Sequence, residues 1–226
     1  ISYIEEPYNF NSVISAMSYS TIEPNHRYVL TYDGDFYHSN NDGNNWQISP
    51  SFDGPDAHYF YGSTIWVSSI NSGKIVIGGS GYSNPPVYIS YDHGQNFQSL
   101  NIGLPNTLVY KIVSSNDEKY LFAATEIGPY VYIFEENYWT HLGGISAPDQ
   151  TYWSVEFISE LNTVRFGTYG RGIWDFIIEN SSFIYGDLNQ DQIVNIQDII
   201  ILVNVVLGLQ ELTVEQIISG DLNLDE

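Results

Sequence analysis

Residues 187–198 place oxygen-bearing side chains at the spacing of a cation-binding loop. In a twelve-residue calcium loop, positions 1, 3, 5, 7, 9 and 12 turn oxygen atoms toward one ion, because calcium prefers six to eight oxygen ligands. In this sequence those positions hold Asp187, Asn189, Asp191, the carbonyl of Ile193, Asn195 and Asp198. We predict that this loop binds Ca²⁺, with Asn195 acting directly or through water. The alternative is a polar turn that only caps the following helix.

A second segment begins with the same pattern 34 residues further along the chain. Asp221, Asn223 and Asp225 occupy its positions 1, 3 and 5, and we predict that they are metal ligands as well. Because the sequence ends at Glu226, we expect this second loop to be incomplete. In the first loop, position 6 is Gln192 instead of the usual Gly, which predicts a strained turn and weaker binding.

The duplicated loop, with a helix after it and Asp at position 12, resembles the dockerin family. The resemblance covers residues 183–226 and implies a small α module that folds around calcium. It also implies docking onto a cohesin domain of a scaffold protein, with Ile196 and Gln197 in the contact. Residues 183–226 contain eight acids and no Lys or Arg, so calcium would relieve their repulsion and act as a folding cofactor.

An apolar helix is predicted directly after the loop. Ile199, Leu202, Val203 and Val206 follow a helical spacing and would form its core face, with apolar surface to spare for a partner. Thr213 and Gln216 form a candidate capping box that opens a second, short helix. The apolar run 199–209 is too short for a bilayer, which needs about 20 residues, so no membrane insertion is expected.

The first 180 residues contain a repeat. Similar strand motifs align four aromatic residues, with separations of 51, 44 and 42: Tyr37, Tyr88, Tyr132 and Trp174. Each unit reads as short alternating strands divided by turn residues, and a period of about 40–50 residues is typical of propeller blades. We therefore predict a mainly β protein: a partial β-propeller of about four blades over residues 1–180, followed by the calcium module.

Two turns of this repeat resemble the Asp-box of sialidase-like propellers, in which Ser, Asp, Gly and an aromatic residue recur at fixed spacing. The resemblance implies a structural role, in which side chains hold the turn and Gly adopts positive φ. The third unit retains only Trp139. The residues of the two boxes are Ser39, Asn41, Gly43 and Trp46, then Ser90, Asp92, Gly94 and Phe97.

Propellers with Asp-boxes usually close with six to eight blades. We expect the missing blades to precede Ile1, since the first residues resemble an internal cut; the alternative is that four blades close alone. In such propellers the Asp-boxes lie opposite the usual binding surface. Function would then reside in loops rich in Tyr, Gly and acids, a composition suited to sugar rings: residues 32–35, 49–63, 78–86, 125–130, 143–153 and 168–172.

A glycosidase would require two carboxylates beside the scissile bond. Asp53, Asp56, Glu126 and Asp149 lie in suitable loops, but each is more simply a solvated acid. A sialidase would require clustered arginines, and the chain contains only three Arg residues. Xyloglucanase-like propellers resemble this pattern more closely. The catalytic residues, if there are any, stay unknown.

Composition narrows the functional classes. A formal charge of −21 argues against nucleic-acid binding and favours a hard cation. There is no Cys for disulfides, thiolate metal sites or a thiol nucleophile. The five His residues show no metal-ligand spacing, and His38 and His93 are interpreted as structural.

The leading hypothesis is a secreted, extracellular or cell-surface polysaccharide-directed propeller tethered to a cohesin scaffold, either a glycoside hydrolase or an accessory module. One rival is a non-catalytic carbohydrate-binding or adhesion propeller. A second rival is a propeller that binds another protein. Release of reducing sugar would separate the enzyme from the binder.

Overall fold

The computed structural model describes residues 8–50, 63–80, 82, 85–143, 147–178, 184–189, 191 and 193–220, without the side chains of 214, 215 and 218. The chain divides into two compact units, residues 1–177 and 178–226. The first unit is β-sheet and the second carries the helices. The prediction of a mainly β chain with four repeated sheets is confirmed.

The first unit contains four antiparallel sheets, each formed by strands in chain order. The first sheet comprises β1 (Ile14–Tyr19), β2 (Arg27–Thr31), β3 (Phe36–Ser39) and β4 (Gln47–Ile48). The second comprises β5 (Thr64–Val67), β6 (Ile75–Gly78), β7 (Val87–Ser90) and β8 (Gln98–Ser99). The third comprises β9 (Val109–Ser114), β10 (Tyr120–Thr125), β11 (Pro129–Ile133) and β12 (Tyr138–His141). The last has three strands, β13 (Tyr152–Ile158), β14 (Thr163–Thr168) and β15 (Ile173–Ile177), with a short 3₁₀ turn at Ser159–Leu161.

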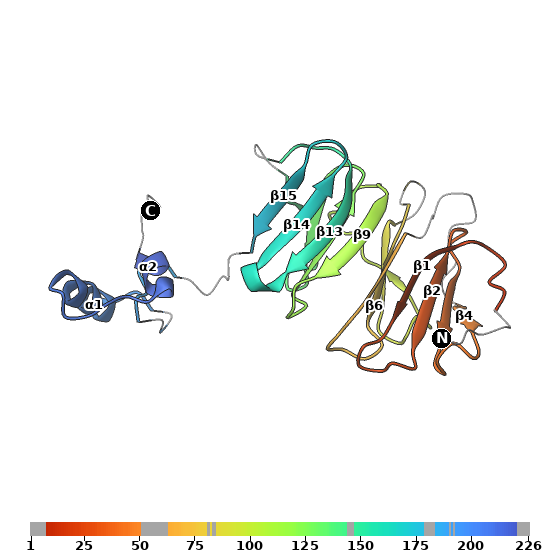
Figure 1. Ribbon diagram of the computed structural model, residues 1–226, viewed down its shortest axis with the longest axis horizontal. Helices are drawn as coiled ribbons and strands as arrows, with labels where there is room; N and C mark the ends of the chain where they lie inside the picture. The colour runs from red at the N-terminus through yellow and green to blue at the C-terminus, as the bar shows by residue number, and fades with distance from the viewer. Residues whose placement is uncertain are drawn as a thin grey trace, which may run out of the picture. The chain divides into compact units, whose positions relative to one another are not determined.

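The sheets follow one another like propeller blades. The first strands of consecutive sheets lie side by side, β1 against β5, β5 against β9 and β9 against β13 (Figure 1). The remaining strands of each sheet lead outward from this inner row. Such an arrangement results from up-and-down meanders whose tight turns keep neighbouring strands antiparallel.

The core lies between the sheets. One buried cluster joins the second and third sheets and includes Val76, Ile89, Ile112 and Trp139. Another joins the first and second sheets and includes Leu30, Phe36 and Ile77. The central strands β6 and β10 are nearly continuous apolar runs because neighbouring sheets cover both of their faces.

Each sheet has two ends with different connections. The β3–β4 and β7–β8 turns, which contain the Asp-boxes, lie at one end, here called the Asp-box end. The loops that join second to third strands lie at the other end, here called the loop end. The sequence therefore separates the structural turns from the loops that can vary for function.

The second unit contains two helices, α1 (Ile196–Val206) and α2 (Val214–Gly220). Thr213 and Gln216 form the capping contacts expected at the start of α2: the Thr213 amide donates to Gln216 Oε1 at 3.1 Å, and the Gln216 amide donates to Thr213 Oγ1 at 3.3 Å. Helix α1 begins at Ile196, although the sequence predicted a helix that starts directly after the loop, at residue 199. Asn195 caps it three residues earlier than expected.

Candidate functional site

Four aromatic residues and one carboxylate gather at the loop end of the last three sheets, and we name this group the platform. Tyr82 lies in the β6–β7 loop and Glu126 in the β10–β11 loop. Tyr110 and Trp153 are near the starts of β9 and β13, and Tyr169 follows β14. Four of the predicted functional loops thus contribute to the platform, namely 78–86, 125–130, 143–153 and 168–172.

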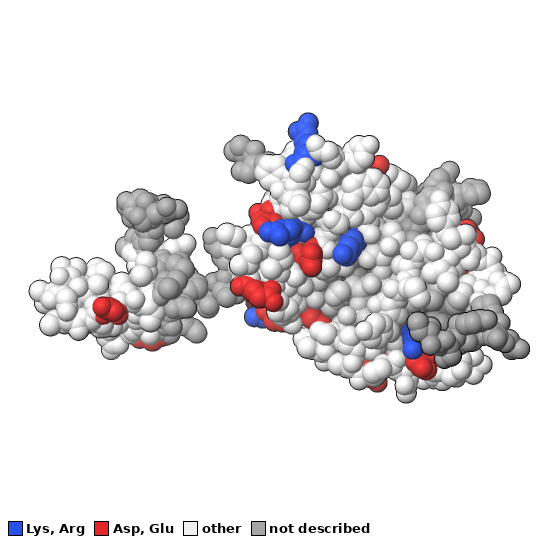
Figure 2. Space-filling view, in the orientation of Figure 1, with Lys and Arg blue, Asp and Glu red and all other residues white. Residues whose placement is uncertain are grey.

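The aromatic rings of the platform form a partly exposed row. The rings of Tyr110 and Trp153 lie 4.3 Å apart between centroids, and those of Trp153 and Tyr169 lie 6.2 Å apart. Trp153 is 49% exposed and Tyr169 is 75% exposed. Most of the surface in view in Figure 2 carries neither acidic nor basic side chains. Exposed aromatic faces suit ligands with apolar faces and polar edges.

Glu126 links two loops of the platform. Its Oε2 accepts a hydrogen bond from the hydroxyl of Tyr82, 44 residues earlier in the chain. This bond, followed by burial and the charge of Glu126, raises the pKa of Tyr82 to about 12. The hydroxyl of Thr151 donates to the backbone carbonyl of Glu126 at 3.2 Å, which joins the third and fourth sheets. Tyr82 thus holds the carboxylate of Glu126, and Thr151 holds the backbone of the same residue.

The other predicted acids differ in position. Asp149 also lies at the loop end, where its Oδ1 is 3.4 Å from Nε2 of His141. Its side chain is 79% exposed, as expected for a solvated acid. Asp53 and Asp56 lie outside the described residues.

The Asp-box residues form closed turns at the other end of the sheets. The hydroxyl of Ser90 donates to Asp92 at 2.8 Å and accepts the amide of Gly94 at 2.9 Å. In the first box, the hydroxyl of Ser39 likewise donates to Asn41 at 3.0 Å and accepts the amide of Gly43 at 2.9 Å.

Both box glycines have the positive φ that the turn requires, +87° at Gly43 and +83° at Gly94. A Cβ at Gly94 would overlap the ring of Phe36, and Phe97 packs edge-on against the same ring at 5.0 Å. Trp46 packs in the same manner against Phe10, at 5.1 Å. These contacts give the boxes a structural role, with the second box docked onto the first sheet.

The predicted calcium loop curls on itself through its oxygen atoms. Oδ1 of Asp187 accepts the amide of Asp191 at 3.1 Å, and Oδ1 of Asp191 accepts the amide of Ile193 at 2.9 Å. The carbonyl of Ile193 accepts Nδ2 of Asn195 at 3.1 Å, and Oδ1 of Asn189 accepts the amide of Asp191 at 3.0 Å. The possible metal ligands are hard oxygen atoms on one short loop, a ligand type that suits calcium.

Asp198 fastens this loop to helix α1. Its carboxylate accepts three backbone amides, from Leu188 at 2.8 Å, Asn189 at 3.1 Å and Asn195 at 2.8 Å. Asn195 in turn accepts the amide of Gln197 at 2.8 Å, which completes a cap at the helix start. The amide of Asn195 is the main cause that lowers the pKa of Asp198. The described residues of the loop are therefore tied to the start of α1 by an acid that is buried.

The apolar side of α1 is not covered by the described residues, which corrects the expectation of a core face. Ile199, Leu202, Val203 and Val206 are all exposed, as are Ile196 and Gln197. In the described part of this unit, the only two helices are too short to enclose a core. A groove of about 440 Å³ runs beside the helix, lined by residues that include Leu188, Ile199 and Leu202. Asp221, Asn223, Asp225 and Gln192 lie outside the described residues.

Sequence reasoning missed one cluster. His26, His38 and His93 lie together at the Asp-box end, although they come from three separate segments. Their separations along the chain match no metal motif, so only the pairing of sheets one and two could reveal them. None of the four aromatic residues of the platform was predicted individually either, although the loops that hold or adjoin them were.

The comparisons with known proteins show the fold. No protein-family model matches the chain. No curated protein matches it either. Among solved structures, a GH74 enzyme from Niastella koreensis has a TM-score of 0.56 at 17% identity, covering 71% of this chain and 27% of that one. An ancestral GH74 enzyme has a TM-score of 0.60 at 19% identity, covering 76% and 26% respectively.

A third similar structure is an extracellular domain from B. thetaiotaomicron assigned to a one-component system. Its TM-score is 0.57 at 18% identity, covering 77% of this chain and 23% of that chain. This chain thus spans about a quarter of the length of these structures. The shared fold identifies the four sheets as blades of a propeller. In the part of the chain that the structure describes, no helix has the length and apolar character to cross a bilayer.

Proposed function

We propose that this chain belongs to an extracellular, polysaccharide-directed propeller protein and that the platform binds the sugar chain. The observation that carries this proposal is the row formed by Tyr110, Trp153 and Tyr169 beside the fixed carboxylate of Glu126. Sugar rings present apolar faces that stack on aromatic side chains, while their hydroxyl groups donate to carboxylates. The likeness to GH74 enzymes supports a glycan as the ligand.

Binding without hydrolysis is the form of this proposal that the geometry favours. Glycoside hydrolysis needs two carboxylates on opposite sides of the bond. Of the platform's residues only Glu126 is acidic, and its Oε2 is engaged by Tyr82. Asp149 lies at the same end of the sheets but is paired with His141. The chain would then supply part of a glycan-binding surface.

The tail is proposed to bind calcium and to dock onto a cohesin-type scaffold protein. Asp187, Asn189, Asp191, Asn195, Asp198 and the carbonyl of Ile193 would hold the ion, with Asp221, Asn223 and Asp225 serving a second site. The bound ion would replace hydrogen bonds within the loop and fix the start of α1. Support comes from the oxygen-rich side chains that Asp198 gathers at the start of α1 and from the exposed side of α1, where Ile196 and Gln197 would contact the partner.

Glycan binding is tested by affinity electrophoresis and calorimetry of the 226-residue chain with xyloglucan and other β-glucans. We expect binding that the double variant Trp153→Ala, Tyr169→Ala abolishes. Tyr91→Ala is the control, because Tyr91 is an exposed tyrosine at the Asp-box end, outside the platform. Failure of every glucan to bind, together with capture of a protein ligand, would favour the protein-binding rival.

A further inference from the structure

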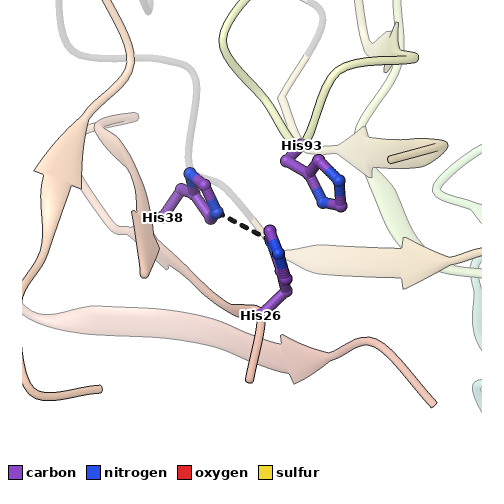
Figure 3. A group of neighbouring side chains, drawn as sticks. All are labelled: His26, His38 and His93. Atoms are coloured by element: carbon purple, nitrogen blue, oxygen red, sulfur yellow. Dashed lines mark hydrogen bonds between the residues drawn. The ribbon is translucent and has the colours of Figure 1, made fainter. Parts of the chain in front are cut away.

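Three histidines from different segments meet at the Asp-box end, between the first two sheets (Figure 3). His26 directly precedes β2, His38 lies in β3, and His93 lies in the second Asp-box turn at a φ of +61°. All three side chains are partly buried, so they are held by packing yet reachable from solvent. Neither the proposed sugar platform nor the calcium loop uses them.

The nitrogen atoms of this cluster already lie close together. Nδ1 of His26 is 3.0 Å from Nε2 of His38, and one nitrogen of each of the three rings lies within 4.8 Å of the others. Two nitrogens bound to one tetrahedral zinc ion are about 3.3 Å apart, given a zinc–nitrogen distance of about 2.0–2.1 Å. The pair formed by His26 and His38 is therefore near ligand spacing, and a bound ion would replace the proton of the hydrogen bond that now joins the two nitrogens.

We propose that His26, His38 and His93 bind one divalent transition-metal ion of the zinc class. Neutral imidazole is a preferred ligand of Zn²⁺, Ni²⁺ and Cu²⁺. The rings of His26 and His93 are stacked with centroids 3.9 Å apart. Metal binding would therefore require a ring rotation that turns a nitrogen of His93 toward the nitrogens of His26 and His38. His93 is held by the hydroxyl of Tyr28 and by stacking on His26 and His38, so the ion would have to draw this ring away from its stacked position.

Two neighbours of His93 suit this role. The hydroxyl of Tyr28 lies 2.8 Å from Nδ1 of His93, the kind of contact that orients a ligating imidazole. Oε2 of Glu23 lies 3.4 Å from Nε2 of the same ring and offers a carboxylate close to the ion. The net charge of −21 raises the local concentration of cations. Because the ion would join residues of two sheets, it would also lock the second blade onto the first.

The test is calorimetric titration of the whole chain with ZnCl₂ in saturating Ca²⁺, which occupies oxygen-rich sites. We expect one zinc ion per chain at the cluster and a rise in melting temperature. The double variant His26→Gln, His93→Gln should lose this event, with the affinity falling at least about tenfold. His141→Gln is the matched control, since His141 lies at the loop end and should leave the titration unchanged.

A second measurement covers the case in which the double variant does not fold. Co²⁺ added to the unmodified chain should give the visible absorption bands of a four-coordinate, nitrogen-ligated ion, and Zn²⁺ should displace it. Tyr28→Phe should weaken binding about tenfold while retaining the bands. Absence of these bands, or zinc binding that persists unchanged in a folded double variant, overturns the proposal. Neither result depends on whether the platform binds glycan.

Discussion

The ring centres of Trp153 and Tyr110 lie 4.3 Å apart, although the two residues lie near the starts of strands in different blades. Tyr110 is the less exposed partner and supports the indole from one side. A ligand that stacks on Trp153 would therefore use an indole whose orientation Tyr110 has already fixed, so part of the entropic cost of ordering the site is removed.

We expect Tyr110→Ala to weaken glycan binding less than Trp153→Ala does. Truncation of a Trp side chain that becomes buried when the ligand binds costs about 2 kcal/mol of binding free energy, or roughly thirtyfold in affinity. Loss of the supporting ring should cost about 1 kcal/mol, the size of one aromatic pair. Calorimetry of both variants measures the difference. Equal affinities for wild type and Tyr110→Ala would show that the ring pair plays no part in binding.

If the platform only binds sugar, the chain should release no reducing sugar from xyloglucan, because Glu126 is the only acid among the described residues of the platform and hydrolysis needs two carboxylates. A reducing-sugar assay at several pH values measures this. Release that both Glu126→Gln and Asp149→Asn abolish would identify these two acids as a catalytic pair and would favour the hydrolase.

In the tail, Asp187→Asn should weaken calcium binding by at least about tenfold, because it removes a charged ligand at position 1. Asp198→Asn should reduce helix content even without calcium, since it weakens a cap worth about 1 kcal/mol. Calorimetry and circular dichroism measure the two effects. Glu211→Gln is the control, an acid of the same unit outside the loop. Calcium affinity unchanged in Asp187→Asn would contradict the assignment.

How far the sequence predicts this molecule differs between its parts. The repeat around Tyr37, Tyr88, Tyr132 and Trp174 predicts the sheets, because strand alternation and turn residues are local signals. The histidine cluster could not be predicted, since His93 reaches His26 only after two sheets pack together. The start of α1 was misplaced because Asn195 can serve as a loop residue or as a helix cap, and the sequence alone does not separate the two.

A buried ion pair joins the second and third blades. Nζ of Lys74 is 3.3 Å from Glu118, and the two side chains are only 9% and 2% exposed. The Lys74 ammonium also lies 4.1 Å from the ring centre of Phe134. Burial opposes ionisation of Glu118, but hydrogen bonds from Ser68, Asn71 and the Ser69 amide, with the charge of Lys74, lower its pKa overall.

Lys74→Ala should lower the free energy of unfolding by about 3 kcal/mol or more, because it leaves a buried carboxylate without its counter-charge. Tryptophan fluorescence in urea measures this for the first unit, which contains all five Trp residues. Lys119→Ala is the matched control: Lys119 pairs with Asp117 in solvent, where such a pair contributes less than about 1 kcal/mol. Equal losses in both variants would mean that burial of the pair is irrelevant.

The stability of the first unit should depend on His38 below neutral pH. Burial, followed by the nearby His26 and His93, lowers the pKa of His38 to about 4. His38 of the unfolded chain binds a proton near pH 6.5, whereas the folded chain binds it only near pH 4. The stability that depends on a neutral His38 is therefore fully present above about pH 6.5 and is lost as the pH falls toward 4. In the presence of a metal chelator, the melting temperature of His38→Gln should fall less steeply over this pH range than that of the wild-type chain. Parallel curves for both proteins would contradict the shifted pKa.

Among the described residues, the last sheet ends at β15 with no strand on its outer side, and Ile173 and Ile177 are exposed there. An open edge with apolar side chains is a template for strand addition from another molecule. Asp175, at the centre of β15 and paired with Arg165, places a charge on this edge that discourages such growth. The isolated chain should therefore be most prone to fibrillar association at acidic pH, where the carboxylate of Asp175 is neutralised.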